Sequence, residues 1–123
     1  MKLLLDTHSV IWLALDRSQI SQPVFDALAD AEQIFVSFAS AWEYGTKRRK
    51  RPEQLTHPFE ALLADIPADR LDMAFDLFRY SESLPPIHHD PFDRMLVAQA
   101  LHHGLTLVSK DRDVRQYPVP TLW

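Results

Sequence analysis

The 123-residue sequence contains no cysteine and only two glycines. The absence of cysteine excludes disulfides, thiolate metal sites and a cysteine nucleophile, and it fits the reducing cytoplasm, which is the location that we expect. The two glycines, Gly45 and Gly104, lie far apart, so no glycine-rich loop can bind ATP or a dinucleotide. Thiol-dependent enzymes and P-loop nucleotide-binding proteins are therefore excluded.

Long apolar runs are also absent. Only three leucines precede Asp6, far too few for the core of a signal peptide, and no later run approaches the ~20 residues that cross a membrane. We therefore expect no membrane partner. The formal net charge of −4 argues against a protein that coats nucleic acid along its length. Hydrophobic residues make up 46% of the sequence, which is enough for a single domain over residues 1–123.

Short apolar segments alternate with helical patterns along the chain. Asp90 and Pro91 mark the start of a helix that runs to His103 and ends at Gly104, a residue suited to a left-handed cap. The alternation predicts a three-layer α/β/α sandwich with a central parallel sheet of four to five short strands. Strands are expected at residues 2–5, 34–36, 70–73, 105–108 and 120–122, and helices at 8–15, 21–31, 37 or 40 to 51, 58–65, 74–83 and 91–103.

Four carboxylates occupy positions that bring them to one edge of this sheet. Asp6 and Asp111 follow apolar strands, while Glu43 and Asp93 lie in the first turns of helices that begin at the same edge. Carboxylates held close together repel one another unless a hard cation lies between them, and Mg²⁺ or Mn²⁺ prefers such oxygen ligands. The pattern predicts a metal site that hydrolyses a phosphodiester by activating water.

Two of these acids have different structural alternatives. Ser40 and Glu43 have the spacing of a capping box, in which the glutamate folds back onto the serine amide. For Asp6 the alternative is weaker, because we expect no helix-capping role that requires its charge.

Two further aspartates compete for the metal. Asp90 precedes Pro91 and suits an N-cap, but it lies one helical turn from Asp93 and remains an alternative ligand. Asp113 competes with Asp111 in the same way, and either aspartate could cap a short helix after Ser109. We prefer Asp93 and Asp111.

The ordered segments LLDTH, SFASAWEYGTK, HHDPFDRMLVAQALHHGLTLVSKDRD and the final PTLW closely resemble the PIN-domain family, specifically the VapC-type toxins of bacterial toxin-antitoxin pairs. The resemblance spans nearly the whole chain. It implies a metal-dependent endoribonuclease that acts on RNA, forms a homodimer and is inhibited by a cognate antitoxin. Asp6, Glu43 and Asp93 match the core acids of the family, Asp111 matches its more variable fourth, and Ser109 matches a serine or threonine beside it.

Several other residues are candidates for functional roles, most of them with more than one interpretation. Thr7 either positions substrate or a metal-bound water, or is a turn residue. The histidines favour loop and cap roles, because no ordered ligand spacing joins them into a zinc site. Trp42 and Phe38 are expected in the core or a dimer interface. The basic run is either a solvated helix end, a contact for an acidic antitoxin or a grip for RNA phosphates, and its members are Lys47, Arg48, Arg49, Lys50 and Arg51.

Two other functional classes are alternatives to a metal-dependent ribonuclease. A haloacid-dehalogenase-like phosphatase also begins with an aspartate after its first strand, but it requires a general acid where this chain has His8. A catalytically silent module with the same fold would bind a protein or RNA partner, and loss of a carboxylate would then leave its activity unchanged. The RNA target, the number of metal ions and the identity of the antitoxin do not follow from the sequence.

Overall fold

The computed structural model describes residues 1–123. Its strands are β1 (Lys2–Leu5), β2 (Gln33–Ser37), β3 (Asp69–Leu71), β4 (Thr106–Val108) and β5 (Thr121–Leu122). Its α-helices are α1 (Thr7–Leu15), α2 (Gln22–Asp30), α3 (Phe38–Lys50), α4 (Phe59–Leu63), α5 (Tyr80–Ser83) and α6 (Pro91–His103). Three short 3₁₀ helices are η1 (Arg17–Gln19), η2 (Phe75–Arg79) and η3 (Val114–Gln116). None of the helices combines the length and apolar character that crossing a bilayer requires.

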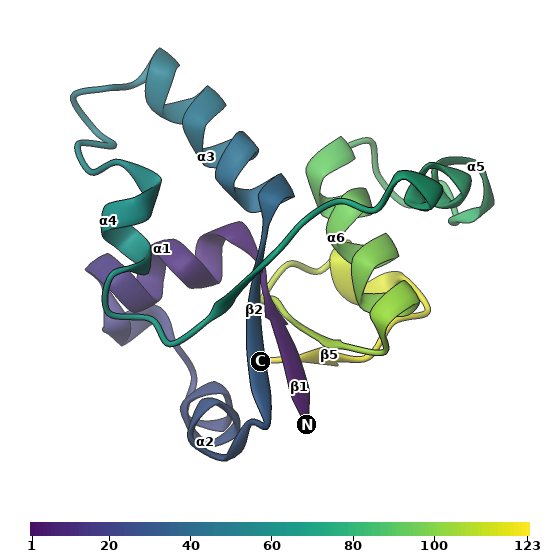
Figure 1. Cartoon of the computed structure of the whole chain (residues 1–123), viewed down its shortest axis with the longest axis horizontal. Coiled ribbons are helices and arrows are strands. Elements are labelled where there is room, and N and C mark those ends of the chain that lie inside the picture. The colour runs from purple at the N-terminus through teal and green to yellow at the C-terminus, as the bar shows by residue number, and fades with distance from the viewer.

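The strands form one five-stranded sheet in the order β3-β2-β1-β4-β5, and every neighbouring pair is parallel. Helices α1, α2 and α4 cover one face, and α5 and α6 lie on the other (Figure 1). This arrangement confirms the predicted three-layer sandwich. The first strand in the chain is the central strand of the sheet, so its carboxyl end lies at the centre of one edge.

The residues of β1 explain why the sheet has two apolar faces. Leu4 packs in a cluster with Leu96 of α6, while Leu3 and Leu5 pack with Val10 of α1 on the opposite face. A slip of one residue would reverse these faces. The same register that buries the three leucines therefore fixes the following residue, Asp6, at the edge of the sheet.

Most predicted elements agree with the structure to within two residues. Gly104 has the left-handed conformation expected of a cap, with φ of 66°. The helix predicted over 74–83 is confirmed in position, but it is a 3₁₀ helix, η2, over its first part and α-helical only in the single turn of α5. Of its apolar residues, Leu77 is buried, but Phe75 and Phe78 are 87% and 57% exposed. No continuous apolar stripe therefore holds this segment in an α-helix.

Candidate active site

Asp6 ends β1 and begins α1. Its backbone amide donates to the carbonyl of Val108 in β4, and its Oδ1 accepts a hydrogen bond of 2.8 Å from the amide of Ser9. Asp6 therefore caps α1, and the expectation that it has no capping role was wrong. The sequence signal was available, because a residue between a strand and an immediately following helix is in the N-cap position.

The capping bond does not remove the cost of burying Asp6, whose side chain is almost inaccessible. Burial raises the pKa of this carboxyl, and hydrogen bonds from Ser9 and Ser109 oppose the rise only in part. A charged carboxylate at this position gains from any cation that approaches it.

Glu43 reaches the same edge from the second turn of α3. Ser37 caps this helix by accepting from the amide of Ala39 at 2.9 Å, so Ser40 lies inside the helix. Oε1 of Glu43 accepts from the Thr7 hydroxyl at 2.5 Å, and Oε2 lies 3.1 Å from Nζ of Lys47. The capping-box alternative for Glu43 is therefore wrong, because the helix is capped three residues earlier, by Ser37.

Thr7 connects the two acids. It follows Asp6 directly in the sequence, and its hydroxyl lies 2.5 Å from Glu43 Oε1 and 3.1 Å from Ser40 Oγ. Both Thr7 and Ser40 are buried. Thr7 thus holds the side chain of Glu43 rather than ending a turn, which makes it a positioning residue for this edge.

Asp93 lies in the first turn of α6. Asp90 is the N-cap of this helix, with its Oδ1 accepting from the amides of Phe92 at 2.9 Å and Asp93 at 3.1 Å. The capping role expected of Asp90 is confirmed, and the side chain of Asp93 is free of that role. Its Oδ2 instead lies 3.3 Å from Nε2 of His88.

The pKa of Asp93 is affected by the other acids of this edge. Burial raises the pKa of Asp93 to about 7, and the negative charges of neighbouring carboxylates add to the rise. The contributing carboxylates, from largest to smallest effect, are Asp90, Glu43, Asp111 and Asp6. The negative charges of Glu43, Asp111 and Asp6 thus all disfavour the charged form of Asp93. That these four acids share one metal stays a prediction.

Asp111 follows β4 and is exposed. Its Oδ1 accepts from the amides of Asp113 at 2.8 Å and Val114 at 3.0 Å, so it holds the turn that leads into η3, whose N-cap residue is Asp113. The buried hydroxyl of Ser109 accepts from the amide of Asp111 at 3.1 Å and so fixes where this turn begins. Asp113 stays an alternative ligand beside Asp111, because ligand atoms of both residues and of His88 lie within 4.8 Å of one another.

His88 is the site residue that sequence reasoning missed. Its Nδ1 lies 3.1 Å from the Tyr117 hydroxyl, and its Nε2 contacts Asp93. Arg94 holds the preceding loop by donating to the carbonyl of Pro85 at 2.8 Å and to the Tyr117 hydroxyl at 3.1 Å. No ligand spacing in the sequence could signal this contact, because it depends on a loop folding back over the start of α6.

The donor set of this edge fits a hard divalent cation. Only His88, Asp111 and Asp113 bring three possible ligand atoms within 4.8 Å of one another. Elsewhere, the carboxylates of Asp6, Glu43 and Asp93 are held by an amide, a lysine and a histidine, respectively. A bound Mg²⁺ or Mn²⁺ would take these carboxylate oxygens as ligands and would offset the repulsion between the negative charges around Asp93.

The basic run divides into residues with different surroundings. Lys47 pairs with Glu43, and Arg48 donates to the carbonyls of Leu55 at 3.0 Å and Thr56 at 3.4 Å, so it holds the chain after α3. The remaining three cations are exposed at the end of the helix, and they are Arg49, Lys50 and Arg51. These three form a free positive surface one to two turns beyond Glu43.

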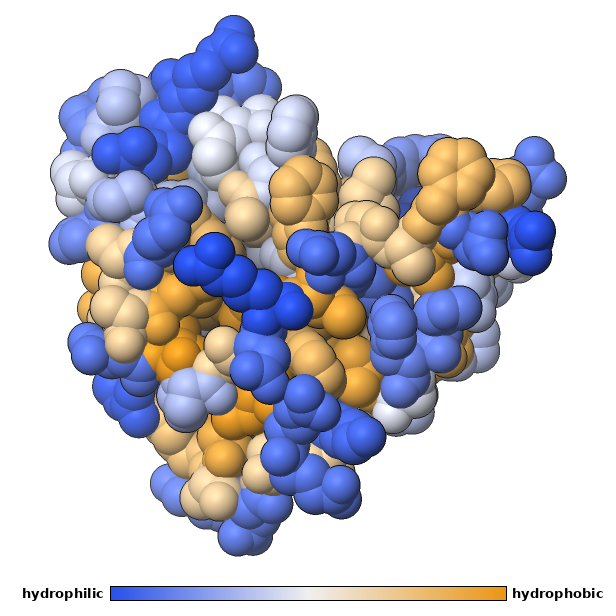
Figure 2. Space-filling model, in the orientation of Figure 1, coloured by the Kyte–Doolittle hydropathy of each residue, from blue (hydrophilic) through white to orange (hydrophobic).

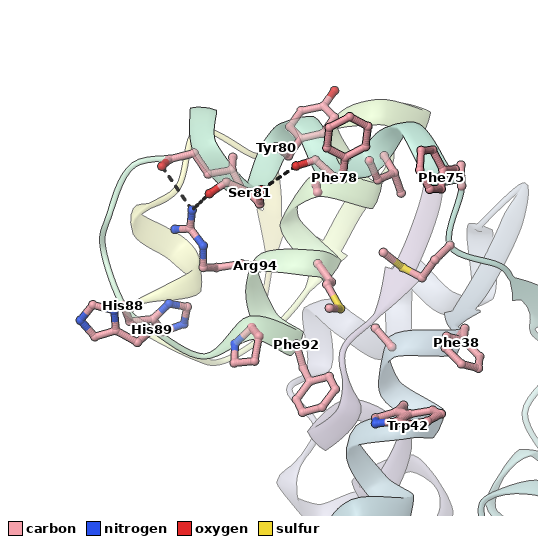
Figure 3. Close-up of a pocket in the computed structure, with 18 of the residues that line it drawn as sticks. Phe38, Trp42, Phe75, Phe78, Tyr80, Ser81, His88, His89, Phe92 and Arg94 are labelled. Carbon is pink, nitrogen blue, oxygen red and sulfur yellow. Dashed lines mark hydrogen bonds between the residues drawn. The ribbon is translucent and has the colours of Figure 1, made fainter.

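An apolar groove of about 1080 Å³ lies beside the acidic edge. Phe38 and Trp42 of α3 form one wall, Phe75 and Phe78 of η2 form the other, and Phe92 lies near its floor (Figure 3). Apolar surface is visible over both α3 and the α5 region (Figure 2). Trp42 is 60% exposed and Phe38 is 50% exposed. Of the two positions expected for these residues, the core is therefore wrong, and the dimer interface stays a prediction.

Comparison with known proteins identifies the family. The PIN domain model matches residues 3–120. Ribonuclease VapC22 of Mycobacterium tuberculosis is 28% identical over 98% of this chain and 97% of its own length.

Two solved structures share the fold. The structure of VapBC2 from Rickettsia felis, bound to a DNA fragment from their promoter, matches with a TM-score of 0.71 and 16% identity over 99% of this chain and 98% of the other. A toxin-antitoxin complex from Klebsiella pneumoniae matches with a TM-score of 0.64 and 21% identity over 98% and 96%. Because the family model covers almost the whole sequence and the fold agrees, the chain belongs to the PIN domain family.

Proposed function

We propose that this chain is a VapC-like endoribonuclease that hydrolyses RNA phosphodiester bonds with Mg²⁺ or Mn²⁺ and is inhibited by a cognate antitoxin. The observation that supports the proposal is a set of contacts at the carboxyl end of the sheet. Thr7, which follows Asp6, bonds Glu43, and His88 contacts Asp93 and lies within 4.8 Å of Asp111. The likeness to a ribonuclease over nearly the full length supports the choice of RNA. The same proposal includes a single nuclease domain over residues 1–123 and a cytoplasmic location.

Four side chains would hold the metal, and they are Asp6, Glu43, Asp93 and Asp111. A bound divalent cation would supply a water of lowered pKa and positive charge near the leaving oxygen. The remaining residues position these acids: Thr7 orients Glu43 through Oε1, and Ser109 sets the turn that carries Asp111. Asp90 stays at the helix cap, because its Oδ1 already accepts from two amides.

The exposed cations at the end of α3 suit the substrate. RNA presents a phosphate at every nucleotide, and an acidic site repels that polyanion unless neighbouring cations offset the charge. Arg49, Lys50 and Arg51 are exposed on the helix that carries Glu43, so they would guide the RNA backbone toward the acids. Arg48 contributes less, because its guanidinium is engaged by backbone carbonyls.

We further propose that the chain forms a homodimer, as the family resemblance implies, and the apolar groove suits such an interface. A monomer seldom exposes this many large apolar side chains side by side, and such patches mark interaction surfaces. The groove carries aromatic residues from α3 and η2, which lie far apart in the sequence. We assign it to a second copy of the chain, with the antitoxin acting at the acidic edge.

Cleavage of a mixed RNA pool tests the nuclease proposal. The purified, antitoxin-free protein should cut with Mg²⁺ or Mn²⁺ and stop with EDTA, and Asp6→Asn should remove cleavage while leaving the circular dichroism spectrum unchanged. Asp65→Asn, which alters an exposed carboxylate far along the chain, is the matched control and should cut normally. Native-rate cleavage by Asp6→Asn would refute the site, and a folded wild-type protein that cuts with neither metal would favour the silent binding module.

A further inference from the structure

Lys47 places a permanent positive charge at the acidic edge. It lies one turn after Glu43 on α3, and its Nζ is 3.1 Å from Glu43 Oε2. The Glu43 side chain is 6% exposed and that of Lys47 is 46% exposed, so the pair joins a buried anion to a cation that reaches it from solvent. No other lysine or arginine forms an ion pair with any acid in this structure.

The pairing leaves Glu43 with no free oxygen. Oε1 accepts from the Thr7 hydroxyl, and Oε2 faces the ammonium group of Lys47. Thr7 is buried and rigidly placed after β1, whereas Lys47 sits on a flexible four-carbon stem at the surface. A cation that binds Glu43 through Oε2 must therefore displace Lys47 or share this oxygen with it.

We propose that Lys47 is an internal counter-ion that competes with the divalent metal for Glu43, and that its released ammonium then contacts an RNA phosphate. This inference rests on the proposed function and adds a role for a residue outside the ligand set. Without metal, Lys47 offsets the buried charge of Glu43 and so lowers the affinity of the free protein for metal. With metal bound, the same side chain becomes an additional cation beside the substrate.

The exposure of the Lys47 side chain indicates where its ammonium group would move once it leaves Glu43. About half of Lys47 already lies in solvent on the helix that also presents Arg49, Lys50 and Arg51. Rotation about its stem would carry the ammonium toward that positive surface, where a phosphate offers a new partner. Metal and RNA would therefore each increase the affinity of the protein for the other. Bound metal frees Lys47 to contact a phosphate, and an RNA phosphate draws Lys47 away from Glu43, where it competes with the metal.

Binding of Mn²⁺ measured by isothermal titration calorimetry, without RNA, tests the competition. Lys47→Met should bind Mn²⁺ roughly three- to tenfold more tightly than wild type, the range expected for losing a half-buried competing ion pair. Lys50→Met removes the same charge one turn further along α3 and should change the affinity less than twofold. Lys47→Arg keeps a cation at this position and should remain closer to wild type than Lys47→Met.

A metal titration of RNA cleavage tests the second role. With the mixed RNA pool, Lys47→Met should reach half-maximal rate at lower Mn²⁺ than wild type but should have a lower plateau, so the two curves cross. An affinity for Mn²⁺ no higher than that of Lys50→Met would overturn the competition, and an unchanged plateau would overturn the phosphate contact. Failure of the underlying site is separable, because Glu43→Gln would then bind Mn²⁺ as wild type does.

Discussion

Replacing Asp93 by asparagine should make the metal-free protein more stable at neutral and alkaline pH. The folded protein holds this carboxyl at a pKa of about 7, against an ordinary value of 3.8. Burial is the main cause, and repulsion from Asp90, Glu43 and Asp111 follows. Asparagine keeps the size of the side chain and removes the charge that these surroundings oppose.

The sign follows from proton binding. Between about pH 4 and pH 7 the folded state keeps a proton on Asp93 that the unfolded chain has lost, so the free energy of unfolding falls as pH rises through this window. The two pKa values differ by about 3 pH units, and each is worth about 1.4 kcal/mol, which gives an upper bound of about 4 kcal/mol. Because the side chain of Asp93 is 19% exposed, solvent screens part of this charge, and we expect about 2 to 4 kcal/mol.

Urea unfolding followed by tryptophan fluorescence, in EDTA from pH 4.5 to 8.5, measures this difference. The free energy of unfolding of Asp93→Asn minus that of wild type should increase with pH and level off above about pH 8. Asp65→Asn should give a flat difference. A flat or decreasing curve for Asp93→Asn would refute the reasoning, because it would mean that the folded protein does not oppose the charge at this position. Saturating Mg²⁺ at pH 8 should stabilise the wild type more than the variant.

Two further substitutions test other parts of the structure. Thr7→Val keeps the shape of the side chain but removes the donor to the buried Glu43 Oε1, so we expect RNA cleavage to fall about tenfold or more at fixed Mn²⁺ and the free energy of unfolding to fall by about 1 to 3 kcal/mol; an unchanged rate in a folded variant would refute the positioning role. Trp42→Lys places a charge in the apolar groove without touching the core, so the protein should shift from dimer to monomer in light scattering coupled to size exclusion; a wild-type protein that is already monomeric would remove the assignment of the groove to a second copy.

The sheet and the position of its acidic edge follow from local sequence patterns. Leu3 to Leu5 form a buried strand whose end is Asp6, and the capped helix from Asp90 to Gly104 places Asp93 in its first turn. These features depend on near neighbours in the chain, so periodicity and capping residues suffice to predict them. Parallel pairing then brings the strand ends together without further information.

The contacts within the site are less accessible to sequence reasoning. Either of two serines, Ser37 or Ser40, could have capped α3 by its sequence. Ser37 is the cap, so Glu43 lies in the second turn and accepts a hydrogen bond from Thr7 instead of folding back onto Ser40. The contact of His88 with Asp93 depends on the path of an irregular loop. The η2 segment differs from the predicted helix because its phenylalanines face solvent, which the pattern of apolar residues does not reveal.

The central position of β1 also bears on how the protein is made. Leu3 of β1 pairs with Ile34 on one side and with Thr106 on the other, so one neighbour is synthesised early and the other very late. A nascent or truncated chain that stops before β4 leaves an apolar strand with an open edge, which is prone to aggregation. It also lacks Asp111. We therefore expect such partial chains to aggregate or to be degraded rather than to fold, and we expect no cleavage of RNA by a ribosome-bound chain until β4 has paired.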